Sequence, residues 1–437
     1  MSPESLISNG VATPRKTVFS LLESGDILLV QDGNHGGNYP AQSDFVEFGG
    51  IPLVTGADIE RGFIDIKGSK QITSGKASDL RVGIAKEGDL LLTHKGTMGK
   101  TAIVPPVDTP FIVVNPQITI YRVNPSGSLS TRFLKYFFDS PEFQEYLNRI
   151  SSTSTVSTLS ITNQKSLEIP CPSIESQNRI SSILGTLDDK IELNRKTEET
   201  LKEIAKALFK SWFVDFDPVR AKAERRHTGL PDEISELFPD SFEESELGEI
   251  PQNWKPKTFG DFTTARRGRI ITRKDTAEGK VPVVAGGMTP AYFHNISNVD
   301  GPVVTISASG ANAGFVNLYF ESIWASDCSY ISKTESEFPF TCYLFLKVSQ
   351  DRIYDAQHGG VQPHINPGDI GRLDFAIAEK QVCKCFEEII SPIFFKIEST
   401  IKESRYLECL RDALLPRLIS GELRVPDAEK MLEEVGI

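Results

Sequence analysis

The chain has 437 residues, and 47 Lys and Arg against 59 Asp and Glu give it a net charge of −12. This length predicts two or three domains, and 39% hydrophobic with 24% charged residues is the composition of a folded protein. The acidic balance excludes a uniformly basic nucleic-acid coat, but not local basic patches. Six cysteines without a CxxC pair predict no metal site. No signal peptide or membrane span is recognisable, so we expect a cytoplasmic protein with reduced thiols.

The first part of the chain predicts a β-rich domain, because short apolar runs are bounded there by Gly or Pro. A turn containing two glycines, 93–100, follows one of these runs, and a polar segment, 151–160, follows a predicted helix. The expected strands are 26–30, 89–92, 111–114 and 117–121, and the expected helix is 131–150.

A heptad pattern follows this domain. Apolar residues recur in alternating steps of four and three from Ile180 to Trp212, which predicts a long helix with one apolar seam. The seam becomes polar at Asn194 and Glu198. Gly185 weakens the helix near its start, so we expect a short helix, a kink and then a long helix.

The next segment, 215–257, is rich in Pro and in acidic residues, and we expect a solvated connector there. A second β-rich domain is predicted to follow it. Its expected parts are strands at 302–306 and 329–331, a glycine turn at 307–314, a helix at 339–353 and a polar segment at 357–366.

The second half of the chain repeats the first. A shift of about half the chain places 190–192 on 396–398, and a second heptad seam runs from Phe386 to Leu418. This seam also becomes polar midway and carries its own break signal at 391–392. Two matching seams favour an antiparallel coiled coil, although each helix could instead pack only on its own domain. The seam residues expected to pair are Ile191, Leu201, Leu208, Trp212, Ile397, Leu407, Leu414 and Leu418.

Three kinds of segment are candidates for binding phosphate or base edges. The run 266–274 holds five cations and no acid, and a sparser basic stretch at 67–81 is its expected equivalent in the first half. The glycine turns permit close backbone approach, and the polar segments carry groups that could contact a DNA groove. A solvated loop or an ordinary hairpin turn is the alternative for each. The candidate DNA-binding residues are Lys67, Lys70, Lys76, Arg81, His94, Lys95, Thr97, Lys100, Arg266, Arg267, Arg269, Arg273, Lys274, Ser307, Ser309, Asn312, His358, Gln362 and His364.

Motifs for catalysis are missing from the sequence. It contains no GxGxxG after a strand, no GxxxxGK[ST], no HExxH and no GxSxG. The triplet 115–117 faintly resembles the catalytic loop of amino-methyltransferases but lacks its second Pro and its aromatic residue, so an ordinary turn is expected. His358 and His364 could be metal ligands, but no third ligand stands nearby at suitable spacing, so no metal site is predicted. No Asp or Glu is paired at a spacing typical of a general acid and base, so no catalytic residue is predicted.

Four local motifs, together with the alternation of domains and helices, resemble the specificity subunit of a type I restriction-modification system across essentially the whole chain. The motifs lie at 170–180, 208–219, 246–254 and 414–423. The second half departs from the first in having Ala376-Ile377-Ala378 where the first has Pro170-Cys171-Pro172.

The resemblance implies an α+β fold in which two β-rich target recognition domains each bind one half of a bipartite, asymmetric DNA sequence. The two helices would set the spacing and dock two methyltransferase subunits that carry S-adenosylmethionine and methylate adenine. Motor-nuclease subunits using ATP and Mg²⁺ would join them, so this chain would itself bind no cofactor and catalyse nothing. The alternative is a two-domain coiled-coil adaptor without DNA. The expected parts are a first recognition domain (1–174), a first helix (175–220), an acidic connector (221–248), a second recognition domain (249–378), and a second helix with the C-terminal tail (379–437).

Overall fold

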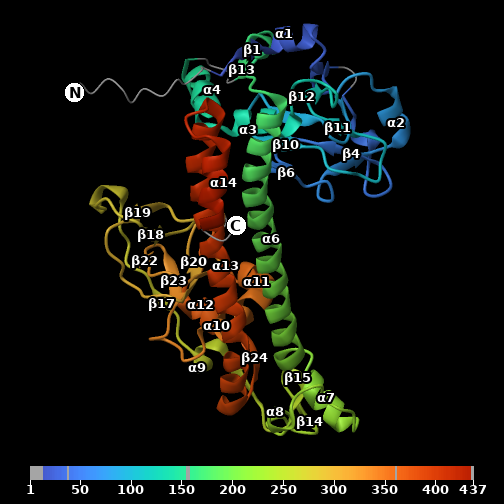
Figure 1. Cartoon of the computed structure of the whole chain (residues 1–437). Coiled ribbons are helices and arrows are strands. Elements are labelled where there is room, and N and C mark those ends of the chain that lie inside the picture. Colours follow the sequence, from blue (N-terminus) through green and yellow to red (C-terminus); the bar gives the residue numbers. More distant parts are fainter. Residues whose placement is uncertain (1–12, 37–38, 154–157, 360–361, 435–437) are drawn as a thin grey trace, which may run out of the picture. The chain divides into compact units, whose positions relative to one another are not determined.

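The computed structural model describes residues 13–36, 39–153, 158–359 and 362–434 (Figure 1). The chain divides into two compact units. Unit 1 holds residues 1–192 and 404–437, and unit 2 holds residues 193–403. Both long helices, α6 (Ile174–Phe213) and α13 (Lys380–Ser420), therefore contribute one part to each unit. No helix among the described residues is both long and apolar enough to cross a membrane.

Unit 1 contains two principal sheets. The antiparallel sheet has the order β10-β9-β12-β2, and the second sheet has the order β3-β7-β4-β11-β8, in which β4 and β11 run parallel. Strand β9 is buried on both faces, as expected from its unbroken apolar run. The strands are β1 (Arg15–Thr17), β2 (Ile27–Asp32), β3 (Phe45–Val46), β4 (Ile51–Val54), β5 (Ile59–Glu60), β6 (Phe63–Ile64), β7 (Lys70–Ile72), β8 (Ile84–Ala85), β9 (Leu90–Thr93), β10 (Thr101–Ile103), β11 (Ile112–Val114), β12 (Ile118–Val123) and β13 (Glu168–Pro170).

Helices α1, α3 and α5 contact the antiparallel sheet, whereas Ala77 of α2 lies in the core of the second sheet. The expected helix 131–150 is two helices, because Ser140 is extended and Pro141 starts the second. Buried aromatic residues such as Phe133 and Phe138 join this layer to Leu184 of α6 in one core. The helices are α1 (Val18–Glu23), η2 (Gln42–Asp44), α2 (Ser74–Asp79), α3 (Thr131–Asp139), α4 (Pro141–Thr153), α5 (Ile161–Lys165) and α14 (Val425–Glu434).

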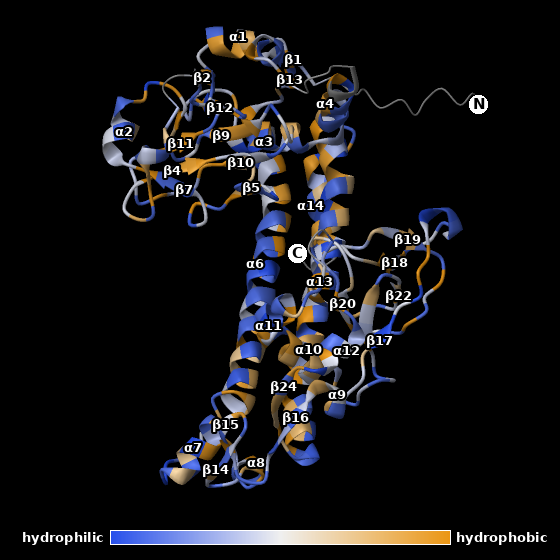
Figure 2. Cartoon of the chain, turned by 180° about the vertical axis from the view of Figure 1, so that it is seen from behind, coloured by the Kyte–Doolittle hydropathy of each residue, from blue (hydrophilic) through white to orange (hydrophobic). Residues whose placement is uncertain are grey.

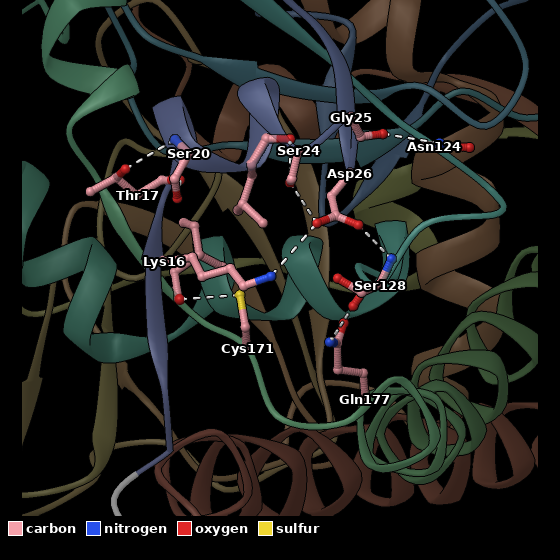
Figure 3. Close-up of polar contacts among 12 residues, drawn as sticks. Lys16, Thr17, Ser20, Ser24, Gly25, Asp26, Asn124, Ser128, Cys171 and Gln177 are labelled. Atoms are coloured by element: carbon pink, nitrogen blue, oxygen red, sulfur yellow. Dashed lines mark hydrogen bonds and ion pairs between the residues drawn. The ribbon is translucent and has the colours of Figure 1, made fainter.

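A buried amide fixes the first domain to the start of α6 (Figure 3). Gln177 is fully buried. Its Nε2 donates to the Ser128 carbonyl at 2.9 Å, as Figure 3 shows. The same Nε2 donates to the Pro172 carbonyl at 2.9 Å, and Oε1 accepts the Ser130 N–H at 2.9 Å. Since Ser130 precedes α3, this side chain satisfies a backbone group at a helix start that would otherwise be orphaned.

The same close-up shows a carboxylate held by several donors. Asp26, 8% exposed, accepts the Ser128 N–H at 2.6 Å and the Ser24 hydroxyl at 2.7 Å, and Lys16 Nζ lies 3.7 Å away (Figure 3). Burial pushes the pKa of Asp26 upward, but the hydrogen bonds from Ser128 and Ser24 outweigh burial and hold the pKa below its ordinary value. The ionised side chain therefore stabilises this turn.

Unit 2 repeats the four-stranded antiparallel sheet of unit 1, but its second sheet has three strands where that of unit 1 has five. Its antiparallel sheet has the order β17-β23-β20-β21, and its second sheet has the order β19-β18-β22, in which β18 and β22 run parallel. The strands are β14 (Phe242–Ser245), β15 (Gly248–Pro251), β16 (Lys255–Thr258), β17 (Arg266–Arg267), β18 (Val281–Val284), β19 (Tyr292–His294), β20 (Val303–Ser307), β21 (Val316–Tyr319), β22 (Trp324–Ala325), β23 (Cys328–Ile331) and β24 (Asp374–Ile377). The helices besides α6 and α13 are α7 (Asp217–Ala223), α8 (Asp232–Ser235), α9 (Phe259–Phe262), η3 (Arg273–Asp275), α10 (Pro339–Val348), α11 (Gln350–Asp355) and α12 (Pro367–Gly371).

A second buried side chain fixes the domain of unit 2 to α13. Glu387 accepts the N–H groups of Phe340 at 3.1 Å and Thr341 at 2.9 Å, and the Thr341 hydroxyl at 2.6 Å. These N–H groups open α10, which corresponds to α3 of unit 1. Burial raises the pKa of Glu387 despite these hydrogen bonds. Both domains therefore use one long buried side chain of a heptad helix to cap a domain helix.

The two long helices pack antiparallel in both units. In unit 1, Ile180, Leu184 and Leu187 of α6 share a core with Leu407, Leu414 and Leu418 of α13. In unit 2, Phe209 and Trp212 of α6 contact Phe386, with ring centroids 5.9 and 5.2 Å apart. The beginning of each helix thus meets the end of the other, which confirms the predicted pairing. Figure 2 shows the outward face of α6 as largely hydrophilic.

The polar steps in the seams make specific contacts. Asn194 is buried and its Nδ2 donates to Glu403 Oε2 at 3.0 Å within unit 2. In unit 1, Arg411 donates to Asp188 at 2.9 Å. The predicted kinks are wrong as breaks, because both helices continue through Gly185 and Pro392. A glycine inside a helix costs about 1 kcal/mol and a proline about 3 kcal/mol, and packing of both helices against each other and against the domains outweighs these costs.

The predicted solvated connector is also wrong over much of its length. Phe216, Phe238 and Trp254 are buried in the core of unit 2, where Trp212 meets Phe238 edge-on at 5.0 Å. This segment forms α7, α8 and the hairpin β14–β15. Most acidic side chains of the segment are exposed to solvent. The segment folds nonetheless, because burial of its aromatic side chains stabilises it.

Candidate nucleic-acid interface

In unit 1, three segments converge beyond the ends of β9 and β12. His94 donates its N–H to the Gln117 carbonyl at 2.8 Å and accepts the Leu159 N–H at 2.9 Å. Lys95 forms a β-bridge with Thr158. The glycine turn, the 115–117 turn and the end of the polar segment therefore form one cluster of loops. The sequence predicted each segment separately, but not that they lie together. Residues 154–157 of that polar segment lie outside the described residues.

Backbone geometry in this cluster requires glycine at two kinds of position. Gly96 and Gly99 have φ of 76° and 90°, a region that other residues rarely adopt. Gly33 lies directly against the 115–117 turn, where an added Cβ would meet the Asn115 carbonyl oxygen at 1.8 Å. The loops approach one another closely only because these side chains are absent.

A buried polar network lies beneath the glycine turn. His94 is 4% exposed, and its Nδ1 lies 2.9 Å from Thr119 Oγ1 and 3.6 Å from Asp32 Oδ1. Thr119 also lies 3.0 Å from Asp32 Oδ1 and accepts Gln164 Nε2 at 2.9 Å. Gln164 in turn accepts the Tyr121 hydroxyl at 2.7 Å. Burial lowers the pKa of His94, against the pull of Asp32, so the ring is neutral near pH 7.

Unit 2 brings the matching segments together. Ala308 donates to the Asp327 carbonyl at 3.2 Å and accepts the Ile365 N–H at 3.0 Å. Ser309 forms a β-bridge with His364. These contacts have the pattern of His94 with Gln117 and Leu159, so the predicted correspondence of the two glycine turns and of the two polar segments extends to their contacts. Residues 360–361 lie outside the described residues.

Asp327 organises the turn of unit 2. It accepts the Ser309 hydroxyl on one oxygen, and Arg267 at 2.6 Å on the other. His358 pairs across a β-bridge with His364 and contacts Asp369 at 3.2 Å. Among the described residues, no group of three or more His, Cys, Asp or Glu side chains is placed to hold a metal.

The basic run of unit 2 is partly neutralised. Arg266 lies 3.1 Å from Glu335, and Arg267 pairs with Asp327. Arg269 lies over the Trp324 ring, 6.0 Å from its centroid. Arg273 and Lys274 belong to η3 and are exposed. The absence of acids within the run did not reveal these partners, which come from distant strands and turns.

The expected basic equivalent in unit 1 occupies a different place. Lys70 lies on β7, 5.7 Å from the Phe45 ring centroid, and Lys76 lies on α2, 3.9 Å from Asp44. Lys67 and Arg81 are exposed in the flanking loops. These residues follow β4, whereas the run 266–274 precedes the matching strand β18, so the equivalence is wrong as a structural match.

The remaining candidates differ in accessibility. Lys95 and Thr97 are exposed, whereas Lys100 donates to the Gly56 carbonyl at 3.0 Å. Ser307 is buried and its hydroxyl has no partner among the described residues. Asn312 is half-buried, and Gln362 and His364 are exposed. Whether these residues contact DNA stays a prediction.

The triplet 115–117 is a closed turn. Asn115 Oδ1 accepts the Gln117 N–H at 3.2 Å, and its Nδ2 donates to Gln117 Oε1 at 3.1 Å. Both functional atoms of the amide are thus used within the turn. Sequence reasoning missed Asp32, Thr119, Gln164 and Asp327, because their proximity depends on strand register, which no local motif encodes.

Comparison with known proteins places this geometry in context. The family model described as the type I restriction modification DNA specificity domain matches residues 21–203. The MjaIX specificity subunit of Methanocaldococcus jannaschii is 27% identical over 90% of this chain and 91% of its own. The HindI specificity subunit of Haemophilus influenzae is 28% identical over 72% of this chain and 81% of its own. The type I system S subunit from M. genitalium has a similar fold, with a TM-score of 0.55, 15% identity and coverage of 96% and 99% of the two chains.

Proposed function

Because this chain belongs to the specificity subunits of type I restriction-modification systems, we propose that each β-rich domain binds one half of a bipartite, asymmetric DNA sequence. The observation that carries the proposal is the paired loop cluster. Two domains with the same four-stranded antiparallel sheet present corresponding glycine turns, yet the side chains around the turns differ. One scaffold with different loop chemistry is what two readers of different half-sites require.

The two heptad helices, in this proposal, set the spacing between the half-sites and dock two methyltransferase subunits. Their continuity and their antiparallel packing in both units support the role of a spacer. The adaptor alternative is not favoured, because the relatives that match most of this chain are specificity subunits.

The chain acts, as we propose, as a non-catalytic DNA-recognition subunit. The methyltransferase subunits supply S-adenosylmethionine and modify adenine N6, and motor-nuclease subunits supply ATP- and Mg²⁺-dependent cleavage. The closed 115–117 turn supports this division of labour, since its amide is already used within the chain. No cofactor site on this chain enters the proposal.

The test is an exchange of one domain in the assembled methyltransferase complex. Residues 13–169 are replaced by the first domain of another family member, while α6 and unit 2 stay unchanged. Mapping of methylated adenines in host DNA should show one altered half, one unchanged half and the same gap. If both halves of the motif change, or if neither changes, the two domains do not each recognise one half-site independently.

A further inference from the structure

The strand ends beside the two loop clusters carry opposite charges at the same position. In unit 1, Thr119 of β12 pairs in register with Asp32 of β2. In unit 2, Ser329 of β23 pairs in register with Arg267 of β17. The next register pairs, Thr119 with Leu92 and Ser329 with Ile306, show that the two sheets align. Position 32 in unit 1 therefore corresponds to position 267 in unit 2.

Hydrogen-bond donors and acceptors fix the protons around Asp32. Gln164 Nε2 donates to Thr119 Oγ1, and the carboxylate of Asp32 can only accept, so the Thr119 hydroxyl donates to Asp32. Thr119 then accepts from His94 Nδ1, which must carry the ring proton. Burial raises the pKa of Tyr121, so its hydroxyl stays a donor to Gln164. The hydrogen bonds from Tyr121 through Gln164 and Thr119 therefore run in one direction and end at Asp32 Oδ1, while Gln164 Nε2 also donates to the Leu159 carbonyl at 2.9 Å.

This arrangement leaves part of the carboxylate free. Oδ1 is held by Thr119, whereas no hydrogen bond or ion pair to Oδ2 is found among the described residues. The Asp32 side chain is 33% exposed, while His94, Thr119 and Gln164 behind it are almost fully buried. A buried network that orders one oxygen and exposes the other suits a fixed hydrogen-bond acceptor.

A carboxylate beside DNA is unsuited to a phosphate, because the two negative charges repel. It can instead accept a hydrogen bond from the exocyclic amino group of cytosine or adenine in the major groove. The matching position of unit 2 holds Arg267, a donor held by Asp327. A change of sign at one matched position is the pattern expected where two domains distinguish different bases.

From these observations we propose that Asp32 determines specificity in unit 1 by accepting a hydrogen bond from the amino group of one base of its half-site. Thr119, His94 and Gln164 are positioning residues that orient its carboxylate. The inference rests on the proposed function, since it requires that unit 1 binds DNA.

The experiment uses the assembled methyltransferase complex carrying Asp32→Ala or the near-isosteric Asp32→Asn. Methylated motifs are mapped, and cleavage-independent binding is measured on a panel of substitutions at each base of both half-sites. Asp32→Ala should reduce discrimination at a single base pair of one half-site by about tenfold or more. The other half-site and the gap should stay the same. Asp32→Asn, which retains one acceptor oxygen, should show a smaller loss at the same base pair.

Variants of the network separate positioning from folding. Thr119→Val should reduce discrimination at the same base pair as Asp32→Ala does. Thr119→Ser, which keeps a hydroxyl, should retain that discrimination. A general loss of stability would instead weaken binding to all sequences alike. Asp79→Asn, a change of an exposed acid in the same domain, serves as the matched control and should leave the motif unchanged.

Two results would overturn the inference. One is an Asp32→Ala complex with unchanged stringency at every base, and the other is an equal loss across both half-sites. The proposed function is unaffected by either result if the wild-type complex methylates a bipartite motif. A wild-type complex that recognises no bipartite motif contradicts the proposed function, and the inference with it.

Discussion

Single buried polar residues decide how each domain is fixed to its helix. Gln177 in unit 1 and Glu387 in unit 2 both satisfy backbone N–H groups where a domain helix begins. Neither role was visible in the sequence, because a Gln or Glu on a predicted helix is usually exposed. The heptad pattern located the helices, but it could not show which of their residues face a domain and which face each other.

Asp26 provides a pH-dependent test at this scale. Because hydrogen bonds hold its pKa below the ordinary value, its ionised form stabilises unit 1 above the unfolded pKa of about 3.9 and is lost as pH falls through the folded pKa. Asp26→Asn should lower the free energy of unfolding by about 1–3 kcal/mol near neutral pH. The difference from wild type should shrink as the pH falls below about 4.

Urea unfolding of the full chain, measured across that pH range, checks this expectation. The exposed Asp79→Asn substitution removes the same charge without the buried hydrogen bonds and should have almost no effect. A deficit for Asp26→Asn that is the same at every pH would show that the charge of the side chain is not what stabilises the turn.

Among elements, the segment from β17 to η3 carries the clearest electrostatic expectation. Arg266 and Arg267 already pair with acids, whereas Arg273 and Lys274 are exposed on η3. Replacing both Arg273 and Lys274 with Ala should reduce the slope of log affinity against log salt by up to about 2 units, equally on all DNA sequences.

Salt titrations of the assembled complex on specific and random duplexes measure that slope. The double substitution of Lys380 and Lys384, exposed cations at the start of α13, removes the same charge elsewhere in unit 2 and should leave the slope unchanged. Equal slopes for the η3 variant and wild type would show that this element contacts no phosphate.

Elements were predictable where the pattern was long or strongly apolar. Runs such as 89–92 and 302–306 became the buried strands β9 and β20, and both heptad seams became helices. Local signals failed where tertiary packing decided the outcome. Pro392 did not end α13, and the acidic 215–257 segment folded over an aromatic core. The candidate site was predicted as loops, but its carboxylates, Asp32 and Asp327, depend on register between distant strands.

At the scale of the whole chain, the boundary between the units crosses both helices, at 192–193 in α6 and 403–404 in α13. Inserting one heptad into each helix at these points keeps the apolar seam in register and lengthens the pair by about 10 Å. If the helices set the spacing, the methylated motif should keep both halves and gain about three base pairs between them.

Methylation mapping of the paired insertion decides this. A heptad inserted into α6 alone is the control, and it should abolish activity because the packing around Asn194 and Glu403 loses its register. If the variant with both insertions is fully active and its methylated motif keeps the original gap between the half-sites, the helices do not set the spacing and serve only to dock the methyltransferase subunits.

The division of the chain also has a consequence for biosynthesis. Unit 2 is one continuous stretch, 193–403, whereas unit 1 needs residues from both ends of the chain. Within unit 1, Thr13 donates to the Ser420 carbonyl at 3.4 Å, and Arg179 pairs with Glu429 at 2.7 Å. A chain emerging from the ribosome can therefore finish unit 2 while unit 1 still lacks its last helices. Until residues 404–437 have been synthesised, Ile180, Leu184 and Leu187 lack the residues of α13 that share their core, and the nascent first domain exposes this hydrophobic face to solvent.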